Sequence, residues 1–228
     1  MATDLLIFGA HPDDAEIGMG GTIAKHAAAN RNVVICDLTF AEMSSNGDVE
    51  TRQREAEEAA AILGVKERIN LGLPDRGLRM EDEQLKEIVK VIRTYQPKAV
   101  FAPYWEDRHP DHTMCSRMVQ EAVFSAKLRK WMPEMPAYAA DQLYFYFIND
   151  MHAPDLIVDV TSCYEQKMKA LQAYRSQFTR ADGSVKTPLN QGYIANVEAR
   201  DRLFGQRRLI QYAEGFKHAV PYLVNQFV

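Results

Sequence analysis

The sequence has few cysteines and no long apolar run. Its three cysteines, Cys36, Cys115 and Cys163, lie far apart and form no CxxC pair, so we expect reduced thiols rather than a disulfide framework. No apolar stretch approaches the roughly 18 residues that a membrane-spanning helix needs, and the first residues lack the basic region of a secretory signal. These absences predict a cytoplasmic protein with no membrane partner.

The chain also lacks an excess of basic residues. Lys and Arg number 27 and Asp and Glu number 31, which gives a formal net charge of -4 at pH 7. A nucleic-acid-binding surface needs positive charge to neutralise phosphates, so no nucleic-acid partner is expected and a small-molecule substrate fits better. The length of 228 residues and the 46% hydrophobic content predict one globular domain over residues 1–228.

Short apolar runs alternate with amphipathic segments along the chain. The pattern predicts strands over residues 5–8, 33–36, 68–71, 99–102, 143–148 and 156–160. It predicts helices over 16–30, 49–63, 81–95, 165–176 and 193–204, and a loop over 179–191. Strands that alternate with helices indicate right-handed crossovers. The expected fold class is therefore α/β, a doubly wound, mainly parallel sheet with helices on both faces.

Two His-Pro-Asp tetrads each follow a predicted strand. Residues 11–14 come after the first strand, and residues 109–112 come after the fourth. In the common strand order 3-2-1-4 these strands are neighbours, and their carboxyl ends meet at one crevice. Imidazoles and carboxylates are the usual ligands of a divalent catalytic ion. We therefore predict that His11, Asp14 and His112 bind one metal.

Two imidazoles and one carboxylate leave coordination positions open for water, which favours hydrolysis. Asp13 and Asp14 are adjacent on a tight turn, so their side chains diverge; Asp13 either accepts the proton of the water or caps the following helix. His109 could protonate a leaving amine or stabilise an oxyanion. Asp111 either fixes the tautomer of His109 as its carboxylate partner or caps the helix that follows.

The same motifs carry a family resemblance. GAHPDDAEIGMGGTIAKHA and APYWEDRHPDH resemble the LmbE-like, or PIG-L, family of metal-dependent N-acetylglucosaminyl deacetylases. SSNGDVETRQREAEEAAAILG and NLGLPDRGL, with YRSQF, TPLNQGY and YAEGF, resemble the bacillithiol-pathway branch, which removes acetate from N-acetylglucosaminyl-malate. The resemblance spans nearly the whole chain. It implies a Rossmann-like fold, zinc held by His11, Asp14 and His112, and a general base at Asp13.

The resemblance also implies roles for three further residues and an assembly. His109 matches a histidine that assists the tetrahedral intermediate, Arg52 a substrate-binding arginine and Tyr193 a tyrosine near the oxyanion. Without the resemblance, Arg52 would read as a solvated helix residue and Tyr193 as packing. Relatives point to a homo-oligomer, with a hexamer as the expected form. Three weaker candidates stay outside the predicted site: Asp75, Arg76 and Gln177.

Other functions are open to the sequence. A dinucleotide-binding protein would need glycines where residues 10–14 read Ala-His-Pro-Asp-Asp. A zinc-binding module without catalysis would have no use for Asp13 or His109, and structural zinc sites are usually rich in cysteine. Two histidines and one carboxylate also form the facial triad of Fe(II) enzymes, so iron is an alternative to zinc. The substrate alternatives to the malate glycoside are N-acetylglucosamine and chitooligosaccharides.

Overall fold

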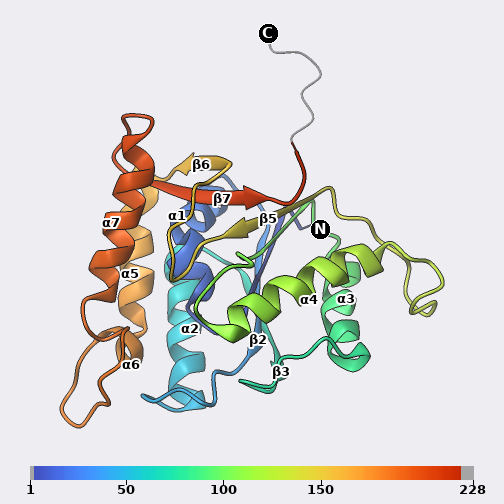
Figure 1. Ribbon diagram of the computed structural model, residues 1–228, viewed down its shortest axis with the longest axis horizontal. Helices are drawn as coiled ribbons and strands as arrows, with labels where there is room; N and C mark the ends of the chain where they lie inside the picture. The colour runs from blue at the N-terminus through green and yellow to red at the C-terminus, as the bar shows by residue number, and fades with distance from the viewer. Residues whose placement is uncertain (1–2, 222–228) are drawn as a thin grey trace.

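A mixed seven-stranded sheet runs through the computed structural model, which describes residues 3–221 (Figure 1). Its strand order is β3-β2-β1-β4-β5-β7-β6. The bounds of the strands are β1 Leu5–Gly9, β2 Val33–Thr39, β3 Glu67–Leu73, β4 Ala99–Pro103, β5 Gln142–Tyr146, β6 Leu156–Asp159 and β7 Ala213–His218. The first five strands pair in parallel. The predicted order 3-2-1-4 and the mainly parallel sheet are confirmed.

Helices cover both faces of the sheet, as the sequence predicts. Their bounds are α1 Asp14–Ala28, α2 Val49–Leu63, α3 Asp82–Tyr95, α4 Pro110–Ala126, η1 Thr161–Cys163, α5 Tyr164–Ala173, α6 Arg175–Phe178 and α7 Tyr193–Gln206. Leu6 and Phe8 of β1 pack with α3 and α4, whereas Leu5 and Ile7 point to the face that α1, α2 and α5 cover. This alternation divides the core into two layers.

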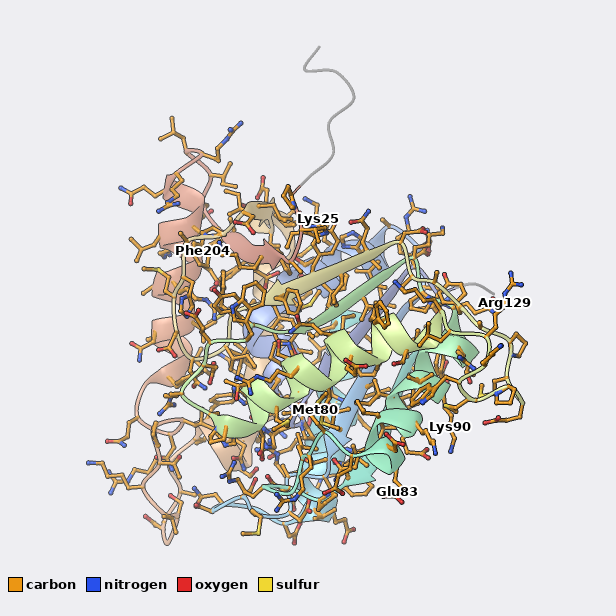
Figure 2. All side chains as sticks on the ribbon, turned by 45° about the vertical axis from the view of Figure 1, so that its right-hand side comes forward. Lys25, Met80, Glu83, Lys90, Arg129 and Phe204 are labelled. Atoms are coloured by element: carbon orange, nitrogen blue, oxygen red, sulfur yellow. The ribbon has the colours of Figure 1, made fainter. Side chains whose placement is uncertain are left out.

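Helix α3 shows how the hydrophobic spacing becomes packing. Four apolar side chains at helical spacing are buried against the sheet: Leu85, Ile88, Val89 and Ile92. Glu83 and Lys90, on the same helix, lie on the outer surface (Figure 2). The segment therefore forms the amphipathic helix that its period of 3.6 residues predicts.

The C-terminal part of the chain departs from the sequence prediction at two places. Strand β7 is absent from the sequence prediction, and it pairs antiparallel with β5 and β6. Its sequence hides the strand, because Glu214 and Gly215 lie in its middle, although all residues up to Phe216 are buried. The helix predicted over 165–176 ends at Ala173, since Tyr174 turns inward with ψ 62° and donates a hydrogen bond to Glu16 at 2.9 Å.

The cysteine and membrane predictions can also be compared with the structure. All three cysteines are buried and free, as expected. Among residues 3–221, no helix combines the length and the apolar character that crossing a membrane requires. The predicted loop over 179–191 contains neither a helix nor a strand.

A fully buried group of charges joins α5, α7 and β7 to α1. Lys167 donates to Asp201 at 2.6 Å and to Glu214 at 2.7 Å. The two oxygens of Glu214 also accept the backbone N–H groups of Gly21 and Thr22, just after a kink in α1. Glu214 thereby caps the second half of α1. One lysine thus neutralises a carboxylate that fixes the helix next to the first tetrad.

We expect Lys167→Met to lower the free energy of unfolding by about 3–5 kcal/mol, because it leaves the buried carboxylate of Glu214 without its cation and leaves Asp201 with Arg200 alone. Urea denaturation at pH 7 measures the loss. The control is Lys169→Met on the same helix, where an exposed ion pair with Glu165 is worth about 0–1 kcal/mol. Equal losses in the two variants would contradict the stabilising role of Lys167.

Candidate metal centre and active site

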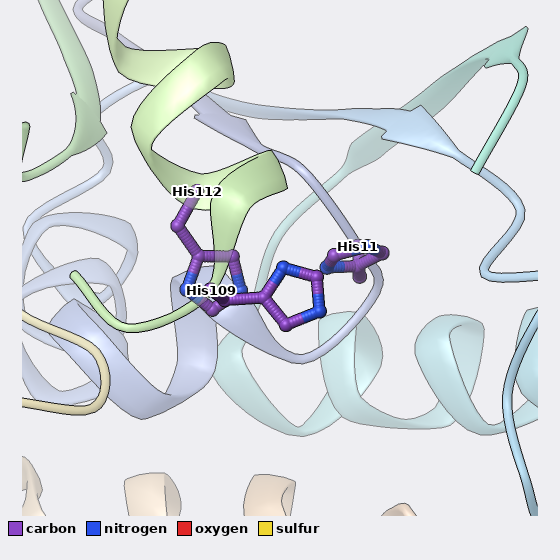
Figure 3. Close-up of side chains that lie close together, drawn as sticks. All are labelled: His11, His109 and His112. Atoms are coloured by element: carbon purple, nitrogen blue, oxygen red, sulfur yellow. The ribbon is translucent and has the colours of Figure 1, made fainter. Parts of the chain in front are cut away.

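The two tetrads meet at the carboxyl ends of β1 and β4. Because β1 pairs in parallel with β4, the turns that follow the two strands lie at the same edge of the sheet. The ring centroids are 4.9 Å apart for His11 and His109 and 4.6 Å apart for His109 and His112 (Figure 3). Side chains almost a hundred residues apart in sequence therefore form one cluster.

Asp14 links the two tetrads. Its Oδ2 accepts the backbone N–H groups of Ala10 at 2.8 Å and His11 at 3.0 Å, which fixes the turn after β1. Its Oδ1 lies 3.1 Å from Nε2 of His112, and Oδ2 lies 3.8 Å from Nδ1 of His11. Burial acts to raise the pKa of Asp14, but the two imidazoles outweigh it and hold this pKa below its usual value.

A second carboxylate holds the far nitrogen of each of these imidazoles. His11 donates from Nε2 to Asp75 at 3.2 Å, and His112 donates from Nδ1 to Asp107 at 3.0 Å. These bonds leave Nδ1 of His11 and Nε2 of His112 facing Asp14. Burial acts to lower the pKa of His112, yet Asp14 and Asp107 raise it to about 9. The surroundings of both rings therefore favour positive charge.

Asp13 occupies the turn between β1 and α1 with a left-handed backbone, φ 112°. Its carboxylate makes no capping hydrogen bond to α1, so the helix-cap alternative has no support in the structure. Oδ2 instead accepts from the guanidinium of Arg52 at 3.2 Å. Burial raises the pKa of Asp13, while the charge of Arg52 acts in the opposite direction. The result is a buried carboxylate that holds a proton more readily than an ordinary aspartate.

The expected pairing of His109 with the Asp111 carboxylate is wrong. The backbone N–H of Asp111 donates to Nδ1 of His109 at 3.2 Å. The carboxylate instead accepts from the backbone N–H and the guanidinium of Arg76, both at 2.9 Å, and lies 3.5 Å from Nε2 of His11. In the first turn of α4, the carboxylate of Asp111 therefore contacts Arg76 and not His109, which is the N-cap residue of this helix. Burial, with the neighbouring imidazoles, lowers the pKa of His109 to about 4.

Arg52 and Tyr193 lie on the wall of a cavity of about 630 Å³ above the cluster. Arg52 is 2% exposed and donates to Pro12 O as well as to Asp13. The Tyr193 hydroxyl donates to Asn149 Oδ1 at 3.1 Å. The structure thus brings every predicted site residue to one cavity or to its floor. The guanidinium of Arg52 already forms an ion pair with Asp13. Its predicted role in substrate binding therefore stays a prediction.

Sequence reasoning missed two residues of the site and undervalued two more. Asp107 carried a usable signal, because it stands two residues before the second tetrad and metal-ligating histidines usually have a carboxylate partner. Asn149 carried none, since it reaches the cluster only because β5 ends beside β4. Asp75 and Arg76, the weaker candidates of the sequence, contact His11 and Asp111 directly.

Comparison with known proteins identifies the family of the chain. The model of the PIG-L family, described as GlcNAc-PI de-N-acetylase, matches residues 6–123. Diacetylchitobiose deacetylase of Thermococcus kodakarensis is 31% identical over 222 residues, which cover 91% of this chain and 79% of that protein. The chain belongs to the PIG-L family.

Further relatives differ in the activity for which they are named. A probable N-acetyl-alpha-D-glucosaminyl L-malate deacetylase 2 of Bacillus anthracis is 29% identical and covers 87% of this chain and 92% of its own length. The crystal structure of the conserved protein TT1542 from Thermus thermophilus is 39% identical, with a TM-score of 0.90 and 99% of both chains covered. A 4-oxalmesaconate hydratase of Pseudomonas putida is 26% identical over 95% of this chain and 89% of its own. Family membership alone therefore does not name the reaction.

We expect Arg52→Gln to raise the pKa of Asp13 further, by at least about one unit, in the metal-free protein. The reason is that a buried carboxyl ionises less readily once its neighbouring cation is removed. Carbon-13 NMR of the aspartate carboxyl groups, followed against pH, measures this shift. Arg54→Gln, an exposed arginine on the same helix, is the control and should leave Asp13 unchanged. An Asp13 pKa that stays or falls in Arg52→Gln would contradict the pairing.

Proposed function

We propose that the protein is a metal-dependent hydrolase that removes the N-acetyl group from a GlcNAc-type substrate. The observation that carries this proposal is the contact of the Asp14 carboxylate with the imidazoles of both His11 and His112, with Asp13 beside them on the cavity wall. The family supports it, because the relatives with named substrates are mostly deacetylases of amino sugars.

Two imidazoles and one carboxylate are a donor set that suits one divalent cation. Two ligands about 2.0–2.1 Å from a tetrahedral ion lie roughly 3.3 Å from each other; Oδ1 of Asp14 lies 3.1 Å from Nε2 of His112, and its other oxygen, Oδ2, lies 3.8 Å from Nδ1 of His11. The nitrogens of His11, His109 and His112 also lie within 4.8 Å of one another, but Nδ1 of His109 is taken by the N–H of Asp111. We therefore assign Asp14 rather than His109 as the third ligand, with zinc as the ion and iron(II) as the alternative.

The chain's own residues have distinct roles in this hydrolysis. A divalent cation supplies Lewis acidity, which polarises the acetyl carbonyl and makes water a better nucleophile. Asp13 accepts the proton of the attacking water, because its raised pKa suits a base near neutral pH. His109 is neutral and carries its proton on Nε2, so it donates a hydrogen bond to the developing oxyanion. The proton that Asp13 takes from the water passes to the leaving amine as the C–N bond breaks. Tyr193 adds a hydroxyl on the cavity wall.

The substrate that we propose is N-acetylglucosaminyl-malate, in bacillithiol biosynthesis. Arg76 and Arg108 line the cavity. Arg108 is exposed, and the Arg76 side chain is 47% exposed although it is paired with Asp111, so both guanidinium groups are accessible to an anionic group attached to the sugar. A chitooligosaccharide has no carboxylate for them to bind. The cytoplasmic location and the homo-oligomeric state remain predictions.

The function can be tested by acetate release from three substrates: N-acetylglucosaminyl-malate, diacetylchitobiose and N-acetylglucosamine. We expect kcat/KM to be at least about tenfold higher for the malate glycoside, because one good charged hydrogen bond is worth about 1.5–3 kcal/mol. Removing the metal with a chelator should abolish release, and added zinc should restore it. Release that survives complete metal removal would contradict the metal-dependent mechanism, and release from none of the sugars would contradict the function.

We expect Asp13→Asn to lower kcat by about 10²- to 10⁴-fold, the usual cost of removing a positioned base, while metal content stays at one equivalent. An amide keeps the shape of the carboxylate but cannot accept the proton. Elemental analysis and initial rates measure the two quantities. The control is Asp155→Asn, because Asp155 is exposed. The Asp37 carboxylate would be a poor control, because Arg68 binds it in the core. A wild-type kcat in Asp13→Asn would remove Asp13 from the mechanism.

A further inference from the structure

Two loops form the outer wall of the active-site cavity. The loop between β2 and α2 contributes Met43, Ser44 and Ser45, and the loop between α6 and α7 contributes Thr187, Pro188 and Leu189. In the ribbon both loops lie at the lower left, at the ends of α2 and α7 (Figure 1). Neither loop carries a predicted metal ligand. They are therefore placed to contact the portion of a substrate beyond its N-acetyl group.

The side chain of Asn46 joins these two loops. Its Oδ1 accepts the backbone N–H of Val185 at 2.7 Å, and its Nδ2 donates to the Val185 carbonyl at 2.9 Å. One amide thus satisfies both polar groups of one backbone residue, as a neighbouring β-strand would do. The backbone carbonyl of Asn46 also accepts from Gln177 Nε2 at 2.8 Å, which ties the first loop to α6.

Within the part of the chain that the structure describes, no other hydrogen bond joins this loop to the rest of the protein. Residues 180–191 make hydrogen bonds among themselves, such as Asn190 with Val185 and Thr187. To the rest of the described chain they are joined by hydrogen bonds only through Asn46. Gly183 and Gly192 have positive φ and open space around them, so nothing at these points restrains the loop. Apart from the packing of Leu189 against the core, the position of the loop over the cavity depends on one asparagine.

The opposite side of the contact is fixed tightly. Gly47 has φ 74°, and a Cβ at this position would lie 2.9 Å from Cβ of Ser176. Ser176 is itself held by the Glu55 carboxylate, which accepts from its backbone N–H at 2.8 Å and from its hydroxyl at 2.6 Å. Asn46 therefore projects from a turn that cannot shift without moving α6 off α2.

We infer that Asn46 is a specificity-determining residue, which sets the outer wall of the cavity by holding residues 180–191 against the β2–α2 loop. The inference rests on the proposed function, because it concerns the part of an N-acetylglucosaminide beyond the sugar. The amide is chemically specific for this role, since an alanine makes neither bond, and an aspartate accepts from the Val185 N–H but has no proton for the Val185 carbonyl.

The first experiment measures the contact without any assay of activity. Lys186 is exposed in the loop, and trypsin should cut after it faster when the loop is released. Two ordinary hydrogen bonds correspond to about a tenfold change in an opening equilibrium and one to about threefold, so we expect Asn46→Ala to be cut about tenfold faster than wild type and Asn46→Asp, which keeps one bond, about threefold faster. Asn196→Ala, an exposed asparagine on α7, should be cut at the wild-type rate. Equal rates in all four proteins would overturn the contact.

The second experiment measures specificity in the same variants. We expect the KM for N-acetylglucosaminyl-malate to rise about five- to tenfold in Asn46→Ala, which loses two hydrogen bonds, and about two- to threefold in Asn46→Asp, which loses one. The KM for N-acetylglucosamine should change less than about twofold in both variants. A faster trypsin cut with equal changes in both KM values would overturn the specificity role and leave the contact. If wild-type protein releases acetate from no sugar, the proposed function fails and the specificity role fails with it, while the proteolysis result still decides the contact.

Discussion

The parallel pairing of β1 with β4 is the constraint on which the site depends. Leu5 lies opposite Ala99 in this pairing, so the two strands end at the same edge of the sheet. The turns that carry the two tetrads therefore meet in one crevice. Asp14 then uses both carboxylate oxygens, one on the turn after β1 and one towards His112 of α4. The pairing also has to be exact in register, because a shift of one residue would exchange the two faces of β1 and separate its turn from α4.

Buried charges have partners both at the site and in the rest of the interior. Buried charges need partners, and Lys167 and Arg200 together satisfy this need for Asp201 and Glu214. Arg93 satisfies it with five backbone carbonyls of residues 126–135. At the site several carboxylates surround three imidazoles, and protons on two of these rings supply the missing positive charge. A divalent cation would take the place of those protons, which is why the acidic surroundings are consistent with a metal centre.

The sequence predicted the features that depend on local pattern. The strand and helix periods placed β1 to β4 and α1 to α3, and the tetrads indicated the crevice. It could not show contacts that depend on tertiary structure: β7 is hidden by Glu214, which is buried only because Lys167 reaches it. The partner of Asp111 was wrong for a similar reason, since Arg76 arrives from a different turn. Neighbours in sequence are poor guides to hydrogen-bond partners where several loops converge.

The inner and outer parts of the cavity wall are held by different numbers of hydrogen bonds. This difference bears on which part of the wall can change in sequence within the family. The inner wall stands on strand ends and helix starts, where Asp14 and Asp107 each make several hydrogen bonds. The outer wall stands on loops, and a single amide joins residues 180–191 to the β2–α2 loop. Loops tolerate change far better than strand ends do. Under the proposed function, the outer wall would contact the group attached to the sugar, and it is the part of the cavity where a change of sequence would disturb the metal site least.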